Sequence, residues 1–346
     1  MILAGGMSTR LYPLTRAVPK PLVPVAGEPI TAHVIRWLAS FGYDEIAINV
    51  YYLADQIKAR FGDGSAFGVK LRYLDEAELM GSAGALKPLE SFFTEPFVVV
   101  GCDDLCDANL DALVAFHHQH DALATIGLVE AEEVDQYGVV ITDSDGRIIE
   151  FQEKPPKGSE RSHLVNTGIY VFDPAIFAHI PADTFYDFGK QVFPSLQVAN
   201  EAFFGMRLLG AYWCDIGTPH EYTRATADVL AGRVAMRGTR LRGIAPDVRL
   251  GDDIHIDGDV RIGSGTVLGK RIRIAGPSVI GDGVHVGDDA VLERAIIWEG
   301  ASIGARARLA DAIVGVGYDV PPDACLVDVI VANEPVASLS SLGIVT

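Results

Sequence analysis

Between residue 1 and about residue 230, short apolar and β-branched segments alternate with amphipathic segments. Four of the apolar segments predict strands: Glu45–Val50, Val69–Leu74, Phe97–Val100 and Thr125–Val129. The segment Pro29–Phe41 predicts a helix because its apolar residues fall on one face, and shorter helices are predicted at Ala54–Phe61 and Asp111–His118. Strands that alternate with helices predict an α/β fold with a mostly parallel sheet. Ligands bind such sheets at the carboxyl ends of the strands, so we expect the chemistry in the loops that follow strands.

After Gly232 the pattern changes to a period of six residues. An apolar residue recurs at nine successive sixth positions: Leu250, Ile256, Ile262, Leu268, Ile274, Ile280, Val286, Leu292 and Trp298. A glycine directly follows many of them, and the period slips by one residue near Trp298 before Ile303 and Leu309 resume it. A six-residue period fits neither an α-helix nor a hairpin meander, and it predicts a hexapeptide-repeat β-helix. We therefore expect two domains, residues 1–232 and 233–346.

The amino-acid composition limits which partners we expect this protein to bind and in which compartment of the cell we expect it. The 346 residues include 46 acidic side chains and 28 Lys or Arg, a formal charge of -18, and 49% are apolar. The apolar share predicts a folded core, and the acid excess argues against a nucleic-acid polymer as a partner. No apolar stretch approaches a membrane span, and four cysteines without metal-binding spacing predict reduced thiols in a cytoplasmic protein. An anionic ligand would have to be bound by a few well-placed groups.

One short segment near the start of the chain supplies such groups. Leu3-Ala4 enters the turn Gly5-Gly6, where backbone N–H groups can approach an anion without hindrance from Cβ atoms. Arg10 and Lys20 follow, and their cationic groups suit phosphate. The alternative is an ordinary Gly-Gly turn with surface cations. The combination of the glycine pair, both cations and the prolines that flank Lys20 favours a phosphate site.

The segment from Leu3 to Leu22 resembles the signature of the sugar-1-phosphate nucleotidyltransferases, also called nucleoside-diphosphate-sugar pyrophosphorylases. Six further motifs of that family follow in order: Gly81–Leu86, Val100–Leu105, Tyr137–Val140, Phe151–Pro155, Asn166–Tyr170 and Trp213–Pro219. The resemblance implies a Rossmann-like (GT-A-like) catalytic domain, followed by the left-handed parallel β-helix that many long members carry. It implies transfer of a nucleotidyl group from a nucleoside triphosphate to a sugar 1-phosphate, with release of pyrophosphate. The motifs look most like those of the mannose-1-phosphate guanylyltransferases, which favours GTP and mannose 1-phosphate. The alternative is dTTP with glucose 1-phosphate, or a related cyclitol or heptose phosphate.

The resemblance also implies roles for individual residues. The nucleotide would be bound by Leu3, Ala4, Gly5, Gly6, Thr9, Gly81, Ser82, Ala83 and Gly84. The catalytic cations would be Arg10 and Lys20. The sugar phosphate would be bound by Tyr137, Gly138, Glu153, Lys154, Asn166 and Thr167. Mg²⁺ would be the cofactor, with Asp103 and Asp215 as ligands and Asp104 as a competitor for the role of Asp103. Two carboxylates together with substrate phosphate oxygens are a common magnesium site.

Other acidic and histidine side chains leave two interpretations open. Glu76 or Glu78, just before the Gly81 loop, could accept hydrogen bonds from a guanine edge, or could form a solvated acidic surface. His117, His118 and His120 could bind a metal, although solvated residues at the end of a helix are the favoured interpretation.

Three features depart from the family pattern. Ser8 and Cys102 stand where glycine is usual. The first strand is also short, so we expect either a natural start upstream of Met1 or an unusually short central strand.

Two other functions compete with nucleotidyl transfer. A non-catalytic regulatory relative is disfavoured because Arg10, Lys20, Asp103, Lys154 and Asp215 are all present. An acyltransferase in the repeat region would need a general base, for which His255 and His285 are the candidates. For the repeats we favour a structural role, namely the formation of a homo-oligomer.

Overall fold

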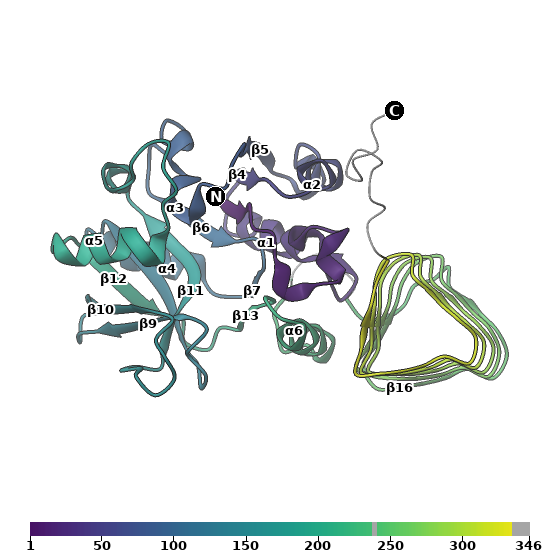
Figure 1. Ribbon diagram of the computed structural model, residues 1–346. Helices are drawn as coiled ribbons and strands as arrows, with labels where there is room; N and C mark the ends of the chain where they lie inside the picture. Colours follow the sequence, from purple (N-terminus) through teal and green to yellow (C-terminus); the bar gives the residue numbers. More distant parts are fainter. Residues whose placement is uncertain (237–240, 334–346) are drawn as a thin grey trace, which may run out of the picture. The chain divides into compact units, whose positions relative to one another are not determined.

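The computed structural model describes residues 1–236 and 241–333. The chain forms two compact units (Figure 1). Unit 1 comprises Met1–Gly6 and Thr31–Asp215, and unit 2 comprises Met7–Ile30 and the chain from Ile216 onward. The domain boundary expected between residues 232 and 233 stays a prediction. Within the described residues, no helix combines the length and apolar character needed to cross a bilayer.

A mixed sheet of nine strands forms the centre of unit 1. Its order is β10-β9-β11-β6-β1-β4-β5, with β8 beside β11 and β12 beside β8. The strands are β1 (Ile2–Ala4), β4 (Glu45–Val50), β5 (Lys70–Asp75), β6 (Phe97–Gly101), β8 (Ala124–Glu130), β9 (Gly138–Thr142), β10 (Ile148–Glu153), β11 (Leu164–Phe172) and β12 (Phe203–Arg207). The segment β6-β1-β4-β5 is parallel, whereas β11 runs antiparallel to β6, β8 and β9. All four strands that the sequence predicts are confirmed.

The helices of unit 1 follow the predicted amphipathic segments. They are α1 (Ile30–Ala39, whose first residue belongs to unit 2), α2 (Ala54–Phe61), α3 (Gly81–Gly84), α4 (Leu110–Gln119), the π-helix η7 (Phe188–Val192) and α5 (Phe193–Val198). The side chain of Asn109 accepts a hydrogen bond from the amide of Ala112 at 3.2 Å, which satisfies a free donor in the first turn of α4. The predicted helices at 29–41, 54–61 and 111–118 are therefore confirmed within two residues at each end.

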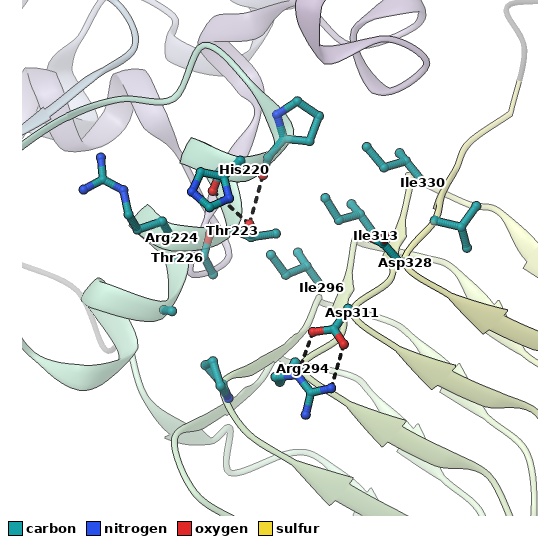
Figure 2. A pocket seen from close by; sticks show the side chains of 14 residues that line it. His220, Thr223, Arg224, Thr226, Arg294, Ile296, Asp311, Ile313, Asp328 and Ile330 are labelled. Atoms are coloured by element: carbon teal, nitrogen blue, oxygen red, sulfur yellow. Dashed lines mark hydrogen bonds and ion pairs between the residues drawn. The ribbon is translucent and has the colours of Figure 1, made fainter. Parts of the chain in front are cut away.

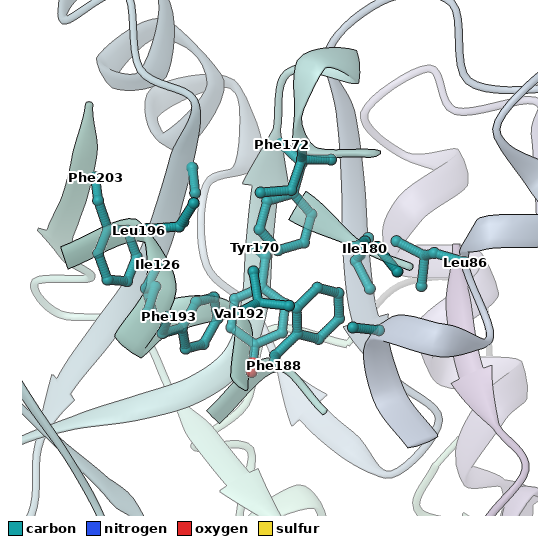
Figure 3. Close-up of a cluster of buried hydrophobic side chains, with 14 of the residues drawn as sticks. Leu86, Ile126, Tyr170, Phe172, Ile180, Phe188, Val192, Phe193, Leu196 and Phe203 are labelled. Carbon is teal, nitrogen blue, oxygen red and sulfur yellow. The ribbon is translucent and has the colours of Figure 1, made fainter. Parts of the chain in front are cut away.

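A cluster of aromatic side chains fills the core of unit 1 around β11 (Figure 3). The Phe188 ring stacks on Phe172, with centroids 4.9 Å apart, and on Phe193 at 5.7 Å. Tyr170 lies in the same cluster and is buried. Such rings bury large apolar areas and favour offset or edge contacts. The cluster therefore fixes η7 and α5 against β11.

The order of the parallel strands defines where a ligand should bind. Within the sheet, the parallel strands lie in the order β5, β4, β1, β6, whereas along the chain β1 comes first, followed by β4, β5 and then β6. The connections change direction between β1 and β6, and these neighbouring strands pair through Leu3 and Gly101. A change of this kind opens a crevice at the carboxyl ends of the two strands. Gly5-Gly6 and Cys102-Asp103 directly follow those ends.

The N-terminal part of unit 2 consists of short turns and a tight hairpin. The turns are η1 (Thr9–Leu11), η2 (Leu14–Arg16) and η3 (Lys20–Leu22), and the hairpin joins β2 (Pro24–Val25) to β3 (Glu28–Pro29). Ala26 and Gly27 form the hairpin loop, with φ of 49° and 81°. Positive φ at both loop residues matches the twist of a two-residue hairpin, and Gly27 accepts it without strain.

Helix α6 (Pro219–Ala231) begins the second part of unit 2. Thr218 caps it by accepting a hydrogen bond from the amide of Glu221 at 3.2 Å, and Pro219 occupies its first turn. Gly232 ends the helix with a left-handed φ of 73°.

The six-residue repeat forms a triangular coil of three parallel sheets (Figure 1). The first sheet contains β14 (Gly243–Ile244), β17 (Val260–Ile262), β20 (Ser278–Ile280), β23 (Ile296–Ile297), β26 (Ile313–Val314) and β29 (Ile330–Val331). The second contains β15 (Arg249–Leu250), β18 (Val267–Leu268), β21 (His285–Val286), β24 (Ser302–Ile303) and β27 (Asp319–Val320). The third contains β16 (His255–Asp257), β19 (Arg273–Ala275), β22 (Val291–Glu293), β25 (Arg308–Ala310) and β28 (Cys325–Val327). This arrangement agrees with the predicted left-handed parallel β-helix.

The structure explains the slip in the repeat. Ile262 pairs with Ile280, 18 residues on, whereas Ile280 pairs with Ile297, 17 residues on. One residue is missing from the corner that leads into β23, where Arg294 turns the chain with a φ of 46°. Ile297 therefore takes the inward position that the six-residue period assigns to Trp298, and that assignment of Trp298 is wrong.

Candidate active site

A buried asparagine, Asn49, holds the end of β1 just before the glycine turn. The Oδ1 atom of Asn49 in β4 accepts a hydrogen bond from the amide of Ala4 at 2.9 Å, and its Nδ2 donates to Oε1 of Glu76. The second carboxylate oxygen of Glu76 accepts from the amide of Met80 at 3.0 Å. Asn49 thus connects the end of β1 with the loop that precedes α3. Since both oxygens of Glu76 bind groups of the chain, the geometry favours a structural role for it over contact with a base.

Gly5 and Gly6 differ in what surrounds them. A Cβ atom on Gly5 would lie 2.9 Å from Nδ2 of Asn49 and 3.3 Å from Oε1 of Glu76, so a side chain there would disturb this support. A Cβ atom on Gly6 would meet nothing within 4 Å, and Gly6 is exposed. Leu3 and Ala4, which complete the predicted nucleotide-binding segment, lie in β1. Gly5 is therefore needed for packing, and Gly6 presents open backbone as a phosphate-binding turn requires.

The predicted nucleotide-binding residues Gly81, Ser82, Ala83 and Gly84 form α3, which packs against the segment before η7. Cβ atoms on Gly81 and Gly84 would lie 2.5 Å from the carbonyl oxygen of Tyr186 and 2.7 Å from that of Thr184. The amides of Ala83 and Gly84 both donate to the Tyr186 carbonyl at 2.9 Å. These glycines are required for internal packing, whatever they also contribute to binding a base.

Ser82 links α3 to Asp187, a residue that the sequence analysis missed. The Ser82 hydroxyl donates to Oδ2 of Asp187 at 2.9 Å and accepts from the amide of Phe188 at 2.9 Å. The other oxygen of Asp187 accepts from the amides of Gly189 and Lys190, which caps η7. An Asp directly before a Phe-Gly-Lys segment is a capping signal, although nothing local indicates that its partner lies more than 100 residues away.

The two predicted metal ligands flank a two-stranded ribbon. In this ribbon β13 (Trp213–Asp215) runs antiparallel to β7 (Asp104–Cys106), and Asp215 lies opposite Asp104. Asp103 directly precedes β7 and is half-buried, as is Asp215. The ribbon therefore brings together two acidic segments that are separated by more than 100 residues in the sequence.

Asp103 and Asp104 have different surroundings, which bears on the choice between them. Asp104 is 6% exposed, and its two oxygens accept hydrogen bonds from the amide of Gly101 at 3.0 Å and from Nε1 of Trp213 at 3.2 Å. A Cβ atom on Gly101 would lie 2.5 Å from Asp104 and 2.9 Å from Asp103, so the glycine lets both side chains fold over the strand end. The contacts of Asp104 support a structural role for it, which leaves Asp103 as the better candidate for a metal.

Four of the predicted sugar-phosphate residues meet at the paired ends of β9 and β10. Glu153 lies opposite Gly138, and the amide of Lys154 donates to the carbonyl of Tyr137 at 3.1 Å. Cβ atoms on Gly138 and Gly189 would lie 3.3 and 2.4 Å from Oε2 of Glu153, so both glycines make room for its carboxylate. Because Gly189 follows Asp187, the Glu153 carboxylate lies close to the α3 and η7 network.

Asn166 and Thr167 lie on β11, where the pairing with β8 is irregular. The Nδ2 group of Asn166 donates to the Tyr170 hydroxyl at 3.0 Å, and its Oδ1 accepts from the amide of Gly168 at 2.9 Å. The Thr167 hydroxyl is buried, donates to the carbonyl of Gly127 at 2.7 Å and accepts from the amide of Ile169. The side chain of Thr167 thus holds the strand, and a ligand role for it stays a prediction.

The predicted cationic residues lie in unit 2. Thr9 and Arg10 lie in η1 and are exposed, while Lys20 begins η3 and is 7% exposed. Ser8 adopts left-handed φ and ψ of 52° and 48°, a conformation that favours glycine. Its carbonyl accepts hydrogen bonds from the amide of Leu11 and from the Thr15 hydroxyl at 2.8 Å, which closes the loop. The geometry therefore explains why this position usually holds glycine.

The histidines do not form a metal site in the described part of the chain. The favoured interpretation of solvated histidines is wrong for His117, which is buried with Nδ1 2.9 Å from the Thr125 hydroxyl. Burial lowers the pKa of His117 to about 4. Across residues 1–236 and 241–333, no group of three or more His, Cys, Asp or Glu side chains is arranged to hold a metal. His255 and His285 are both exposed and lie on different sheets of the β-helix. The structure thus does not bring those two histidines into one site.

Unit 2 contains a groove that is separate from these residues (Figure 2). Its volume is about 750 Å³, and it lies between α6 and the first sheet of the β-helix. His220 and Thr223 line one side, and Ile296, Ile313 and Ile330 line the other. None of the predicted site residues lines this groove.

Burial raises the pKa of Glu153, with the charge of Asp187 acting in the same direction and Lys154 opposing it. A carboxyl group whose folded-state pKa is raised stabilises the fold below its unfolded pKa of about 4.3, and this contribution is lost as the pH rises through the folded-state pKa. We therefore expect Glu153→Gln to raise the Tm at pH 7 to 8, with a gain that shrinks as the pH falls to about 4. Thermal unfolding across pH would measure this, with exposed Glu132→Gln as the control. A gain for Glu153→Gln that does not change with pH would contradict it.

Comparison with known proteins agrees with this fold and these motifs. Residues 1–232 match the family model described as nucleotidyl transferase. The chain is 36% identical over 281 residues to a UTP--glucose-1-phosphate uridylyltransferase of Synechocystis sp., covering 75% of this chain and 72% of that protein. It is 33% identical over 247 residues to a mannose-1-phosphate guanylyltransferase of Mycobacterium tuberculosis, covering 69% and 67%. The chain therefore belongs to the nucleotidyl transferase family.

Two further comparisons extend this result. The catalytic subunit beta of mannose-1-phosphate guanylyltransferase from Drosophila pseudoobscura is 38% identical over 226 residues, which cover 64% of this chain and 60% of that protein. A Bacillus anthracis crystal structure assigned as a glucose-1-phosphate thymidylyltransferase superimposes with a TM-score of 0.61 over 69% of this chain and 96% of that chain. At 24% identity, this last similarity concerns the fold alone.

Proposed function

We propose that this protein transfers a nucleotidyl group from GTP to mannose 1-phosphate, releasing pyrophosphate and forming GDP-mannose. The observation that carries the proposal is the family match over residues 1–232, combined with the arrangement of Gly5-Gly6 and Asp103 after adjacent strands at the point where the connections change direction. The relatives from Mycobacterium tuberculosis and Drosophila, which are named for this reaction, support the choice of substrates.

The reaction needs positioning and charge neutralisation more than a protein nucleophile. The sugar phosphate oxygen attacks the α-phosphorus of the nucleotide in line with the departing pyrophosphate. In our proposal the amides after Gly5 hold the triphosphate, Arg10 neutralises the leaving pyrophosphate, and Lys20 neutralises the reacting phosphates. Lys154 would hold the phosphate of the sugar. Glu153 would accept hydrogen bonds from sugar hydroxyls, and Asn166 would donate to them or accept from them.

We further propose that Asp103 and Asp215 hold Mg²⁺. Carboxylate oxygens are the hard donors that Mg²⁺ prefers, and two of them leave positions for phosphate oxygens and water. The pairing of β7 with β13 and the separate hydrogen bonds of Asp104 support this ligand set. When bound, the ion would neutralise phosphate charge.

A second pair of substrates is supported by one specific observation. The Synechocystis relative aligns over three quarters of this chain and is named for UTP and glucose 1-phosphate. The residues that choose between bases and sugars lie outside the shared motifs, so we add UTP with glucose 1-phosphate to the earlier alternative of dTTP with glucose 1-phosphate.

The proposal is tested by a matrix of nucleotides and sugar phosphates. Purified protein with Mg²⁺ is incubated with GTP, dTTP, UTP, CTP or ATP and a panel of sugar 1-phosphates, and pyrophosphate release is measured. We expect the highest kcat/KM for GTP with mannose 1-phosphate. A preference for UTP with glucose 1-phosphate, or for dTTP, would replace the substrates but keep the reaction. Absence of pyrophosphate release from every combination would overturn the proposed function.

We also propose that the β-helix supports a homo-oligomer. Light scattering after size-exclusion chromatography would measure the mass in solution, and a monomeric mass at micromolar concentration would contradict this.

A further inference from the structure

One face of the β-helix differs from the other two. In the first sheet, Ile262, Ile280, Ile297 and Val314 point into the interior cluster, so their neighbours in the strands point outward. The outward residues Val279, Ile296 and Ile313 are nevertheless buried, at 3 to 4% exposure. On the other two sheets, outward residues such as His285 and Arg308 are exposed. The first sheet is therefore covered on its outer side by other parts of unit 2.

Tyr222 of α6 connects this face to the hairpin of β2 and β3. Its ring is fully buried, and its hydroxyl accepts a hydrogen bond from Nε1 of Trp298 at 3.0 Å. The same hydroxyl donates to the carbonyl of Pro24 at 2.7 Å. Burial raises the pKa of Tyr222, so the hydroxyl keeps its proton and can donate at neutral pH. Trp298 follows β23, so a single buried hydroxyl joins the β-helix to the first residue of the hairpin.

A second contact fixes the loop of the same hairpin. A Cβ atom on Gly27 would lie 2.1 Å from the guanidinium carbon of Arg261, so this side chain lies directly against the turn. Arg261 belongs to β17, and its side chain is 12% exposed and 3.5 Å from Asp282. Its Nη1 atom is buried without a hydrogen-bond partner, which is an unfavourable arrangement that the packing on Gly27 maintains.

The hairpin directly follows Lys20. The amide of Val23 donates to the carbonyl of Lys20 at 3.0 Å, and the amide of Ile30 donates to the carbonyl of Val23 at 2.9 Å. The backbone of Lys20 is therefore hydrogen-bonded to Val23, and Val23 is in turn hydrogen-bonded to the far end of the hairpin that Tyr222 and Arg261 hold. A displacement of the hairpin would also displace η3.

We propose that the β-helix positions Lys20 for catalysis, and that Tyr222, Trp298 and Arg261 are its positioning residues. This inference rests on the proposed function, in which Lys20 neutralises the reacting phosphates. It gives the repeat region a role within a single chain, independent of any homo-oligomer. Since a displacement of about 1 Å can reduce a rate by about 10²-fold, modest movements of the hairpin should be measurable in kcat.

The first test removes the hydroxyl and the indole N–H separately. Tyr222→Phe breaks both hydrogen bonds, and Trp298→Phe breaks one while keeping an aromatic ring. We expect kcat to fall about 10- to 100-fold for Tyr222→Phe and less for Trp298→Phe, with the KM for both substrates within about twofold of the wild type. Hydrogen exchange should rise in the peptide covering residues 20–30, a readout that does not depend on activity.

The matched control is Leu309→Ala, which opens a cavity in the β-helix interior where Leu309 is 1% exposed. It should lower the Tm at least as much as Tyr222→Phe while leaving kcat and exchange at residues 20–30 unchanged. If Leu309→Ala lowers kcat equally, general loss of stability explains the effect and the inference is overturned.

A double-mutant cycle tests the contact between Gly27 and Arg261. Gly27→Ala should expel the guanidinium from the turn, so adding Arg261→Ala should reduce kcat little further. Additive effects would show that the two residues influence kcat independently of their contact, which would contradict a positioning role for this contact. If the wild type is active and kcat is unchanged in Tyr222→Phe, Trp298→Phe, Gly27→Ala and Arg261→Ala, the positioning role is overturned and the proposed function stays intact. An inactive wild type would instead contradict the proposed function itself.

Discussion

Asp103→Asn is expected to lower kcat by about 10²- to 10³-fold, the size of effect seen when one preorganised charge stabiliser is removed from an active site. The substitution keeps the shape of the side chain and removes the negative charge that would hold Mg²⁺. Because Asp103 is half-buried at a strand end, we expect the Tm to change by no more than about 2–4 °C. Pyrophosphate release at saturating substrate, measured over a range of Mg²⁺ concentrations, would check this.

Asp104→Asn is the matched control, since the two residues are adjacent and chemically identical. Asn has only one side-chain oxygen, so a buried donor on Gly101 or Trp213 would lose its acceptor, at a cost of about 1–3 kcal/mol in unfolding free energy. We expect a lower Tm with kcat within about tenfold of the wild type. The opposite pattern, with activity lost at Asp104 and kept at Asp103, would transfer the metal role to Asp104.

Lys20→Met is expected to have an effect of similar size. Methionine resembles the lysine stem in length and apolar character but lacks the ammonium, so the substitution isolates the contribution of the charge. We expect kcat to fall about 10²- to 10³-fold, because neutralisation of the reacting phosphates would be lost. Steady-state kinetics with circular dichroism of the same samples would separate loss of catalysis from loss of fold.

Lys70→Met provides the comparison for this variant, since Lys70 has 81% of its side chain exposed and forms a surface ion pair with Glu45. Its kcat should match the wild type. A wild-type kcat in Lys20→Met would refute the proposed role of Lys20 and, with it, the basis for positioning by the β-helix.

The elements that repeat or that are buried along their whole length could be predicted from the sequence. The apolar core of the parallel strands gives a continuous local signal, as in Phe97–Gly101. In the β-helix every coil buries its residues in the same way, so the six-residue period survives in the sequence. Thirteen of the 36 glycines lie between Val248 and Gly317, and several of them would clash with the backbone of the next coil if they carried a side chain.

The contacts that complete the candidate site could not be predicted, because they depend on partners that are distant in sequence. Nothing near Asn49 indicates that it holds Ala4 and Glu76, and nothing near Asp187 points to Ser82. The six-residue period also misplaced Trp298. One shortened corner puts Ile297 in the inward position, so Trp298 points outward to Tyr222 of α6. The distinction between Asp103 and Asp104 likewise required the hydrogen bond from Trp213, which lies 109 residues from Asp104.

The change from 18-residue to 17-residue coils separates a part of the β-helix that makes the contacts to α6 and the hairpin from a part whose length can vary. Trp298 makes the hydrogen bond to Tyr222 of α6, and Arg261 makes the contact with Gly27 of the hairpin. The amide of Trp298 also donates to the carbonyl of Val314 in the next coil. Beyond Val314, each ladder continues in steps of 17 residues, as from Val314 to Val331. Because neighbouring coils interact mainly with one another, whole coils can be added or removed there as modules. The β-helix is thus divided into a fixed base, whose sequence is constrained by its contacts with α6 and the hairpin, and an extension that is free to lengthen or shorten by one turn at a time.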